Sequence, residues 1–139
     1  MGEMEYEESP QEVAARRRAL GVGKAISDTA RVKFDKVRGV DFRTSNIILM
    51  ERTLGKKSWQ IIQEFRMGGW GQEDLMGVLW AGLLKDNPEV TIHDAYAIWD
   101  ATPYSDRTKA LTQLSYALIR ALGVNIDQSG EIHSEESKK

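Results

Sequence analysis

Few residues in this sequence could bind a metal ion through nitrogen or sulfur. The chain has 139 residues, no cysteine and two histidines, His93 and His133. Without cysteine, disulfide bonds, thiolate catalysis and zinc–cysteine sites are excluded. The histidines lie 40 positions apart, and the carboxylates around them follow no metal-ligand spacing. We therefore interpret His93 as a surface residue and expect neither a metal ion nor a cofactor.

The segment closest to a phosphate-binding loop is "GVGKAISD", in which a Gly-Lys pair follows a glycine. The complete P-loop pattern requires glycine where the chain has Arg18, and serine or threonine where it has Ala25. The dinucleotide fingerprint fails as well, because Ile26 occupies a glycine position. We do not expect this segment to bind a nucleotide.

The sequence also lacks the patterns of hydrolytic enzymes. No serine occupies a Gly-x-Ser-x-Gly elbow. The paired acids Glu73 and Asp74 fall at the start of an expected helix, where the helix dipole favours negative charge. The pair Glu135 and Glu136 lies near the end of the chain. Because no motif points to catalysis, we predict that the protein is not an enzyme.

The remaining candidates would bind a partner. Arg16, Arg17 and Arg18 form the densest basic run, "ARRRA". A DNA-binding helix would carry asparagine or glutamine on the same face, which this run lacks, so a solvated or partner-facing helix is favoured. Trp70 lies between two glycines, with no periodic stripe to bury it. Its indole either tucks into the core or, if exposed, anchors a partner.

Charge is distributed unevenly along the chain. The net charge is −5 over residues 1–15, +8 over 16–66 and −5 over 67–139. The simplest interpretation is an asymmetric solvated surface. A basic middle between acidic ends could also contact nucleic acid or an acidic protein, and it suits head-to-tail self-association.

Composition and periodicity together predict the fold class. Hydrophobic residues make up 41% of the chain and charged residues 29%, as in an ordinary globular domain. No apolar run reaches the roughly 18 residues of a membrane span. We predict a mainly α, compact domain of about five helices over residues 9–123. A disordered acidic segment, 1–8, would precede it, and a flexible polar tail, 124–139, would follow.

Caps and apolar stripes locate the helices. Ser9 and Glu12 form a capping box for a thin first helix. The other expected helices occupy 44–55, 58–69, 72–87, 91–100 and 105–123. In the helix at 58–69, Ser58 is the expected cap and Trp59 is expected to face Ile62. The segment at 72–87 is apolar nearly all round and should be central, and Trp80 and Trp99 should belong to the core.

Residues 22–43 are harder to assign. Val32 and Phe34 alternate with charged residues, as do Val40 and Phe42. This period of two favours a short β-hairpin near residues 31–43, turning near Val37–Gly39. The alternative is an irregular basic helix over residues 24–36.

The middle of the chain resembles the tail assembly chaperones of long-tailed, siphovirus-type bacteriophages and of gene transfer agents. The residues that carry the resemblance include the stretch 52–100, "RTLGKKSWQIIQEFRMGGWGQEDLMGVLWAGLLKDNPEVTIHDAYAIWD". The resemblance covers roughly residues 44–100. Its features are Leu54-Gly55 at a helix end, the glycine loop Gly68–Gly71, the core helix Leu79–Leu83, the Asn87-Pro88 break and the Thr-capped helix Thr91–Asp100.

The resemblance implies an assembly role without catalysis. Chaperones of this family bind the tape measure protein and help to recruit tail tube subunits during tail morphogenesis. The protein would act in the host cytoplasm, associate with itself and be absent from the mature virion. The alternative is a small nucleic-acid-binding regulator that uses the basic segment 16–66.

Overall fold

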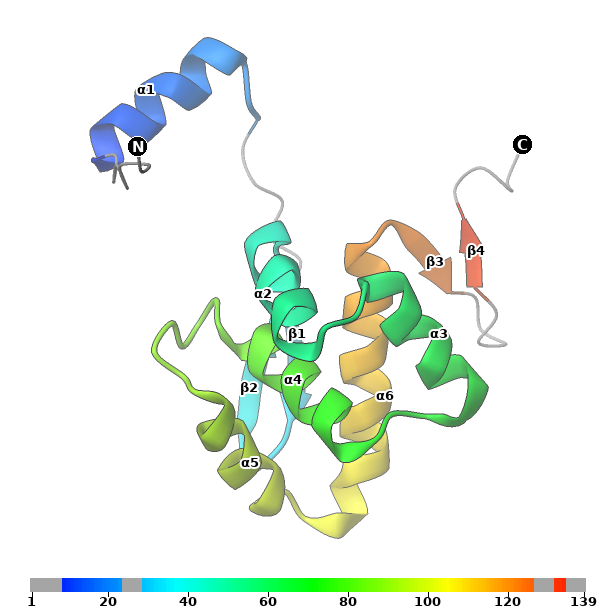
Figure 1. Cartoon of the computed structure of the whole chain (residues 1–139). Helices are drawn as coiled ribbons and strands as arrows, with labels where there is room; N and C mark the ends of the chain where they lie inside the picture. The colour runs from blue at the N-terminus through cyan, green and yellow to red at the C-terminus, as the bar shows by residue number, and fades with distance from the viewer. Residues whose placement is uncertain (1–8, 24–28, 127–131, 135–139) are drawn as a thin grey trace.

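The computed structural model describes residues 9–23, 29–126 and 132–134. The mainly α prediction is confirmed. In order, the described elements are α1 (Pro10–Leu20), β1 (Ala30–Lys33), β2 (Val37–Val40), α2 (Thr44–Leu54), α3 (Ser58–Gly68), α4 (Gln72–Leu83), α5 (Ile92–Asp100), α6 (Tyr104–Ala121), β3 (Val124–Ile126) and β4 (Ile132–Ser134) (Figure 1). The predicted disordered segment, 1–8, lies outside the described residues.

Helix α4 is central, as its apolar sequence predicts. It packs against α2, α5, α6 and β2. Its buried residues are Leu75, Met76, Gly77, Val78, Leu79, Ala81, Gly82 and Leu83. Trp80 is half-buried, and its indole N–H donates a 3.0 Å hydrogen bond to the carbonyl of Val90. The hydrophobic core extends from Val32 to Ile119, so it draws on the hairpin and on the helices from α2 to α6.

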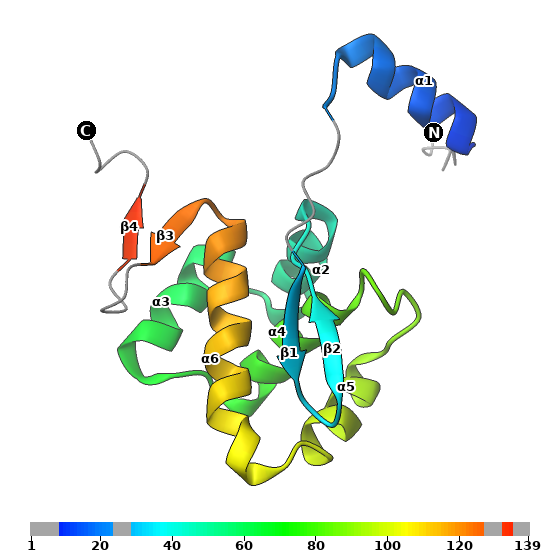
Figure 2. The same ribbon diagram turned by 180° about the vertical axis from the view of Figure 1, so that it is seen from behind.

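The β-hairpin prediction is confirmed, and the alternative helix over 24–36 is wrong, since Ala30–Lys33 is a strand. Residues 24–28 lie outside the described part. The hairpin packs against α6 through β1 and against α4 through β2 (Figure 2). Val32 and Phe34 are fully buried there, and this burial selects the strand over the helix because alternate residues of a strand share one face.

The turn of the hairpin precedes the predicted position. Lys33 pairs with Val37, so the chain turns over residues 34–36 and not near Val37–Gly39. The Asp35 carboxylate accepts a 2.9 Å hydrogen bond from the backbone N–H of Lys36 and two of 2.7 Å from the guanidinium of Arg38. These side-chain bonds stabilise a turn that contains no glycine.

The predicted capping box of Ser9 and Glu12 begins α1, and the predicted cap Thr91 begins α5, where it forms a second capping box with Asp94. The expected cap of α3 is wrong. Ser58 lies inside the helix, and its backbone N–H donates a 2.8 Å hydrogen bond to the carboxylate of Glu51. A side chain of α2 thus satisfies the start of α3, which sequence spacing within α3 could not reveal.

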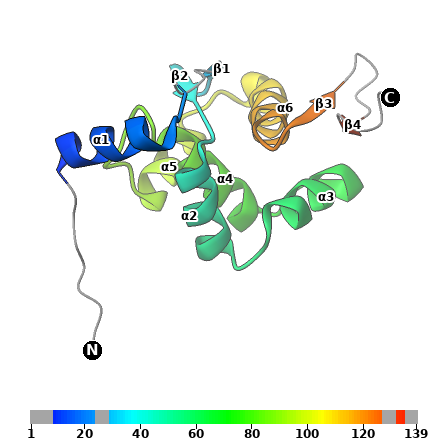
Figure 3. The same ribbon diagram turned by 90° about the horizontal axis from the view of Figure 1, so that it is seen from above.

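The two ends of the chain behave differently from the core. Helix α1 has no buried residue and projects from the body (Figure 3). At the other end, the predicted flexible polar tail contains an antiparallel strand pair, in which Asn125 is opposite His133, and β3 also packs on α6. Short segments containing Val124, Ile126 and Ile132 have the β propensity for such pairing, although they are too short to form an apolar stripe.

Candidate partner-binding surfaces

The three predicted arginines lie on α1, and all are exposed. Because a helix turns about 100° per residue, Val13 and Leu20 share one side of α1, with Arg16 and Arg17 flanking them. Leu20 is 72% exposed. We call these four residues the α1 ridge. Arg18 lies on another side of the helix.

Trp70, for which the sequence left both a core position and a partner anchor open, is engaged within the protein. Its indole N–H donates a 2.8 Å hydrogen bond to the carbonyl of Ile61, and its ring lies 4.8 Å from that of Phe65, centre to centre. These contacts hold the α3–α4 loop against α3 and leave Trp70 half-buried. The loop lies far from α1 in Figure 1, so the structure does not bring Trp70 and the arginines together. Partner binding by Trp70 stays a prediction.

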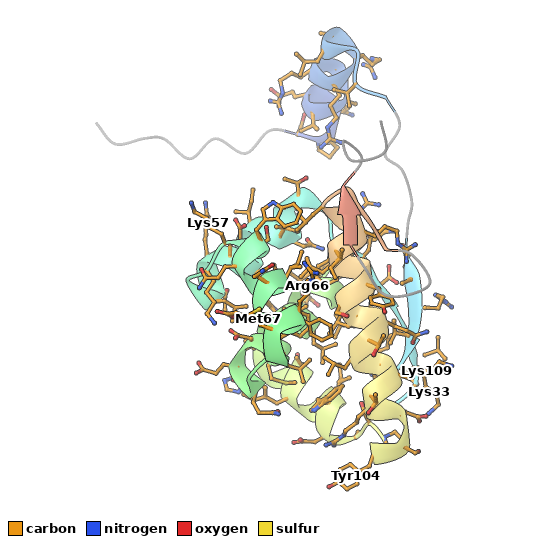
Figure 4. All side chains as sticks on the ribbon, turned by 90° about the vertical axis from the view of Figure 1, so that its right-hand side faces the viewer. Lys33, Lys57, Arg66, Met67, Tyr104 and Lys109 are labelled. Atoms are coloured by element: carbon orange, nitrogen blue, oxygen red, sulfur yellow. The ribbon has the colours of Figure 1, made fainter. Side chains whose placement is uncertain are left out.

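An exposed face of α3 was missed at the sequence level. Ile61 and Ile62 are buried on the inner side, whereas Trp59 is 55% and Met67 78% exposed. Of the expected Trp59–Ile62 pair, only Ile62 is buried, and the pairing itself stays a prediction. Trp59, Gln63 and Met67 recur every four residues along the outside, with Arg66 beside Met67, and we call these four residues the α3 outer face. Figure 4 labels Arg66 and Met67 on this helix. The signal in the sequence was the phase of the buried isoleucines.

A shallow groove of about 280 Å³ lies between the start of α4 and the end of α5. We call it the α4/α5 groove, and its lining residues are Gln72, Glu73, Met76, Tyr96, Trp99 and Asp100. Met76 and Trp99 are buried, and Tyr96 is 41% exposed. Within the described part of the chain, the carboxylates of Glu73 and Asp100 make no hydrogen bond or ion pair. The groove thus combines an apolar floor with two unpaired negative charges.

Trp99 is held rigidly below this groove. Its ring packs edge-on against Phe34, with 6.5 Å between ring centres, and the guanidinium of Arg107 lies 5.3 Å from it. Arg107 also donates hydrogen bonds to the carbonyls of Trp99 and Thr102. One face of the groove is therefore pre-organised by contacts from β1–β2 and α6.

Ion pairs of Lys56 connect α3 and α4, the helices on either side of the α3–α4 loop. The ammonium of Lys56 lies 2.8 Å from the Glu64 carboxylate and 2.9 Å from that of Asp74. The hydrogen bond to Glu64, followed in importance by the one to Asp74, raises the pKa of Lys56. The hydrogen bond from Lys56 in turn lowers the pKa of Glu64. The triad joins the end of α2 to α3 and to the first turn of α4.

The described residues include no group of three or more histidine, aspartate or glutamate side chains that could hold a metal ion. His93 is exposed, as predicted, and lies edge-on to Tyr96. Most of the "GVGKAISD" segment lies outside the residues that the structure describes. None of the described helices is long and apolar enough to cross a membrane.

Comparison with known proteins found no family model, no curated protein and no solved structure that matches the chain.

Proposed function

We propose that this protein is a tail assembly chaperone of a long-tailed phage or gene transfer agent. It binds the tape measure protein and helps to recruit tail tube subunits, without catalysis, in the host cytoplasm. The sequence resemblance over residues 44–100 supports this role. The observation that carries it is the α3 outer face, which combines an exposed tryptophan and an exposed methionine on one helix.

The α3 outer face has the composition of a binding surface. Aromatic side chains, methionine and arginine are enriched at protein interfaces, and methionine adapts its shape to different apolar partners. Single exposed apolar residues are ordinary on a protein surface. Here Trp59 and Met67 lie eight residues apart on the same side of α3, with Arg66 between them. Within the described part of the chain, Arg66 has no ion-pair partner.

This composition suits an amphipathic helix of the tape measure protein. Apolar residues of the client would cover Trp59 and Met67, and an acidic residue would pair with Arg66. A long helical client offers such a segment repeatedly, so several copies of the chaperone would bind along it and associate with one another.

Co-expression tests the proposal directly. The tagged protein should capture the tape measure protein and the tail tube protein encoded with it. Trp59→Ala combined with Met67→Ala should weaken capture of the tape measure protein about 30-fold or more, as loss of interface anchors does. Tyr104→Ala is the matched control, because Tyr104 is 83% exposed but lies away from α3 (Figure 4). Undiminished capture by the double variant would exclude the α3 outer face as the client site.

The alternative regulator would need an available basic surface in residues 16–66. Several of those charges are already paired: Lys33 with Asp106, Arg38 with Asp35, and Lys56 with Glu64 and Asp74. These pairs reduce the positive field that would attract phosphates. Retention on DNA that falls steeply with salt, together with no capture of the tape measure protein, would favour the regulator.

A further inference from the structure

Helix α1 is well specified by local signals, but no part of it is buried by the rest of the described chain. Its Ser9–Glu12 capping box is complete, and Gly21 ends it with φ +74° while its N–H bonds back to Arg17 and Arg18. None of its 11 residues is buried. Isolated helices shorter than about 12–15 residues are marginal in water, because nucleation costs more than the few hydrogen bonds return. A surface that covers α1 would therefore stabilise it.

The α4/α5 groove has the chemistry that the α1 ridge lacks. The ridge presents an apolar side chain, Leu20, with arginines beside it. The groove presents an apolar floor with the unpaired carboxylates of Glu73 and Asp100 at its edge. Its volume of about 280 Å³ is below the roughly 300–1,000 Å³ of a small-molecule site, and matches one or two side chains better than a ligand.

We propose that the α1 ridge of one copy docks into the α4/α5 groove of a second copy. Leu20 enters the groove beside Tyr96 and Trp99, and Arg17 pairs with Asp100. This contact deepens the self-association that accompanies the proposed function. It requires no client, so its failure would leave capture of the tape measure protein untouched.

The arrangement of the elements favours docking between copies. Helix α1 projects from one end of the body, whereas the start of α4 and the whole of α5 lie at the opposite end (Figures 1 and 2). Each copy therefore carries a ridge at one end and a groove at the other. Such a head-to-tail contact uses two different surfaces, and it repeats until it closes into a ring or continues as a filament.

Sedimentation velocity of the full chain, without client, tests this contact through single charge reversals. The unaltered protein should associate with rising concentration, and less so at high salt because exposed charges are screened. Arg17→Glu and Asp100→Lys should each weaken association about tenfold, since an attraction becomes a repulsion. Arg18→Glu is the matched control on another side of the same helix and should leave association unchanged. Leu20→Ala should also weaken it.

Charge exchange provides the decisive measurement. Mixing the Arg17→Glu and Asp100→Lys proteins, or combining both changes in one chain, should restore association because opposite charges face each other again. Circular dichroism should show that every variant keeps the helices of the folded body, since all the altered side chains are exposed. A monomer at all concentrations would overturn the proposal. So would an equal effect of Arg17→Glu and Arg18→Glu, or a failure of the exchange to restore association.

Discussion

The backbone N–H of Asp41 donates a 2.9 Å hydrogen bond to the carbonyl of Gly82, which places the end of the hairpin directly on α4. The missing side chain of Gly82 permits this approach. A Cβ atom there would lie 2.9 Å from Cγ1 of Val40 and 3.0 Å from Cζ of Phe42. The junction between the hairpin and the central helix therefore depends on a glycine inside a helix.

Gly82→Ala should lower the free energy of unfolding by about 1–3 kcal/mol, because the added methyl group overpacks the junction. The gain in helix propensity, at most about 1 kcal/mol, offsets only part of this loss. Urea unfolding followed by circular dichroism measures the change. Gly68→Ala is the control, since a Cβ at Gly68 meets no atom within 4 Å. It should be neutral or slightly stabilising, and an equal loss in both variants would contradict the overpacking argument.

Asp41→Asn should destabilise the fold by about 1–3 kcal/mol, because it leaves a nearby ammonium without its counter-charge. Asp41 is 8% exposed, and its carboxylate lies 3.3 Å from the ammonium of Lys85 and 3.2 Å from the hydroxyl of Thr29. Chemical denaturation of Asp41→Asn and of the control Lys33→Met, at the same salt concentration, tests this. Lys33→Met, which removes the more exposed pair with Asp106, should cost no more than about 1 kcal/mol. The argument fails if Lys33→Met is the more damaging change.

The Asp35–Arg38 pair should make stability depend on pH in the acid range. The hydrogen bonds from Arg38 lower the pKa of Asp35 in the folded protein below its unfolded value of about 4. The pair therefore contributes fully above that value and loses its contribution as the pH falls through the lower, folded pKa. Because the pair is partly exposed, the contribution should stay below about 1 kcal/mol.

Asp35→Asn should accordingly show a smaller loss of stability than the unaltered protein between pH 7 and the acid end of the titration. Urea midpoints at a series of pH values measure this difference. Arg38→Met should behave in the same way, and the two changes together should add little to either alone. Parallel curves for Asp35→Asn and the unaltered protein would show that the pair does not contribute.

Two tryptophans should respond very differently to truncation. Trp99→Ala should lower the free energy of unfolding by about 3–5 kcal/mol, because it removes a buried ring that packs on Phe34 and Arg107. Trp59→Ala should change it by no more than about 0.5 kcal/mol, because the ring is largely exposed. Denaturation followed by circular dichroism compares them without relying on tryptophan fluorescence. Similar losses would show that Trp59 is covered in solution.

Several elements could be predicted from the sequence because their signals are local. The capping boxes at Ser9 and Thr91 lie within three residues of their partners, and both predict helix starts that the structure contains. The near-continuous apolar character of α4 predicted a central helix. The alternation at Val32 and Phe34 predicted the hairpin, because burial of every second residue is a property of strands.

The candidate surfaces were less predictable, because they depend on residues that are far apart in the sequence. The sequence showed that Arg16 to Arg18 form a basic run. It did not show that α1 would have no buried residue. Trp70 lacked a periodic stripe, and only the folded chain supplied the carbonyl of Ile61 for its indole. The exposure of Trp59 followed from which side of α3 the core covers.

The sequence by itself determined where most helices begin and end, which segment is central and how charge varies along the chain. These properties arise from neighbours within a few residues. The tertiary structure alone decided which face of each helix meets the core, since that choice depends on all the elements packing at once. It also brought Glu73 and Asp100, from two different helices, to the edge of one groove, and it set Glu51 to cap a helix other than its own.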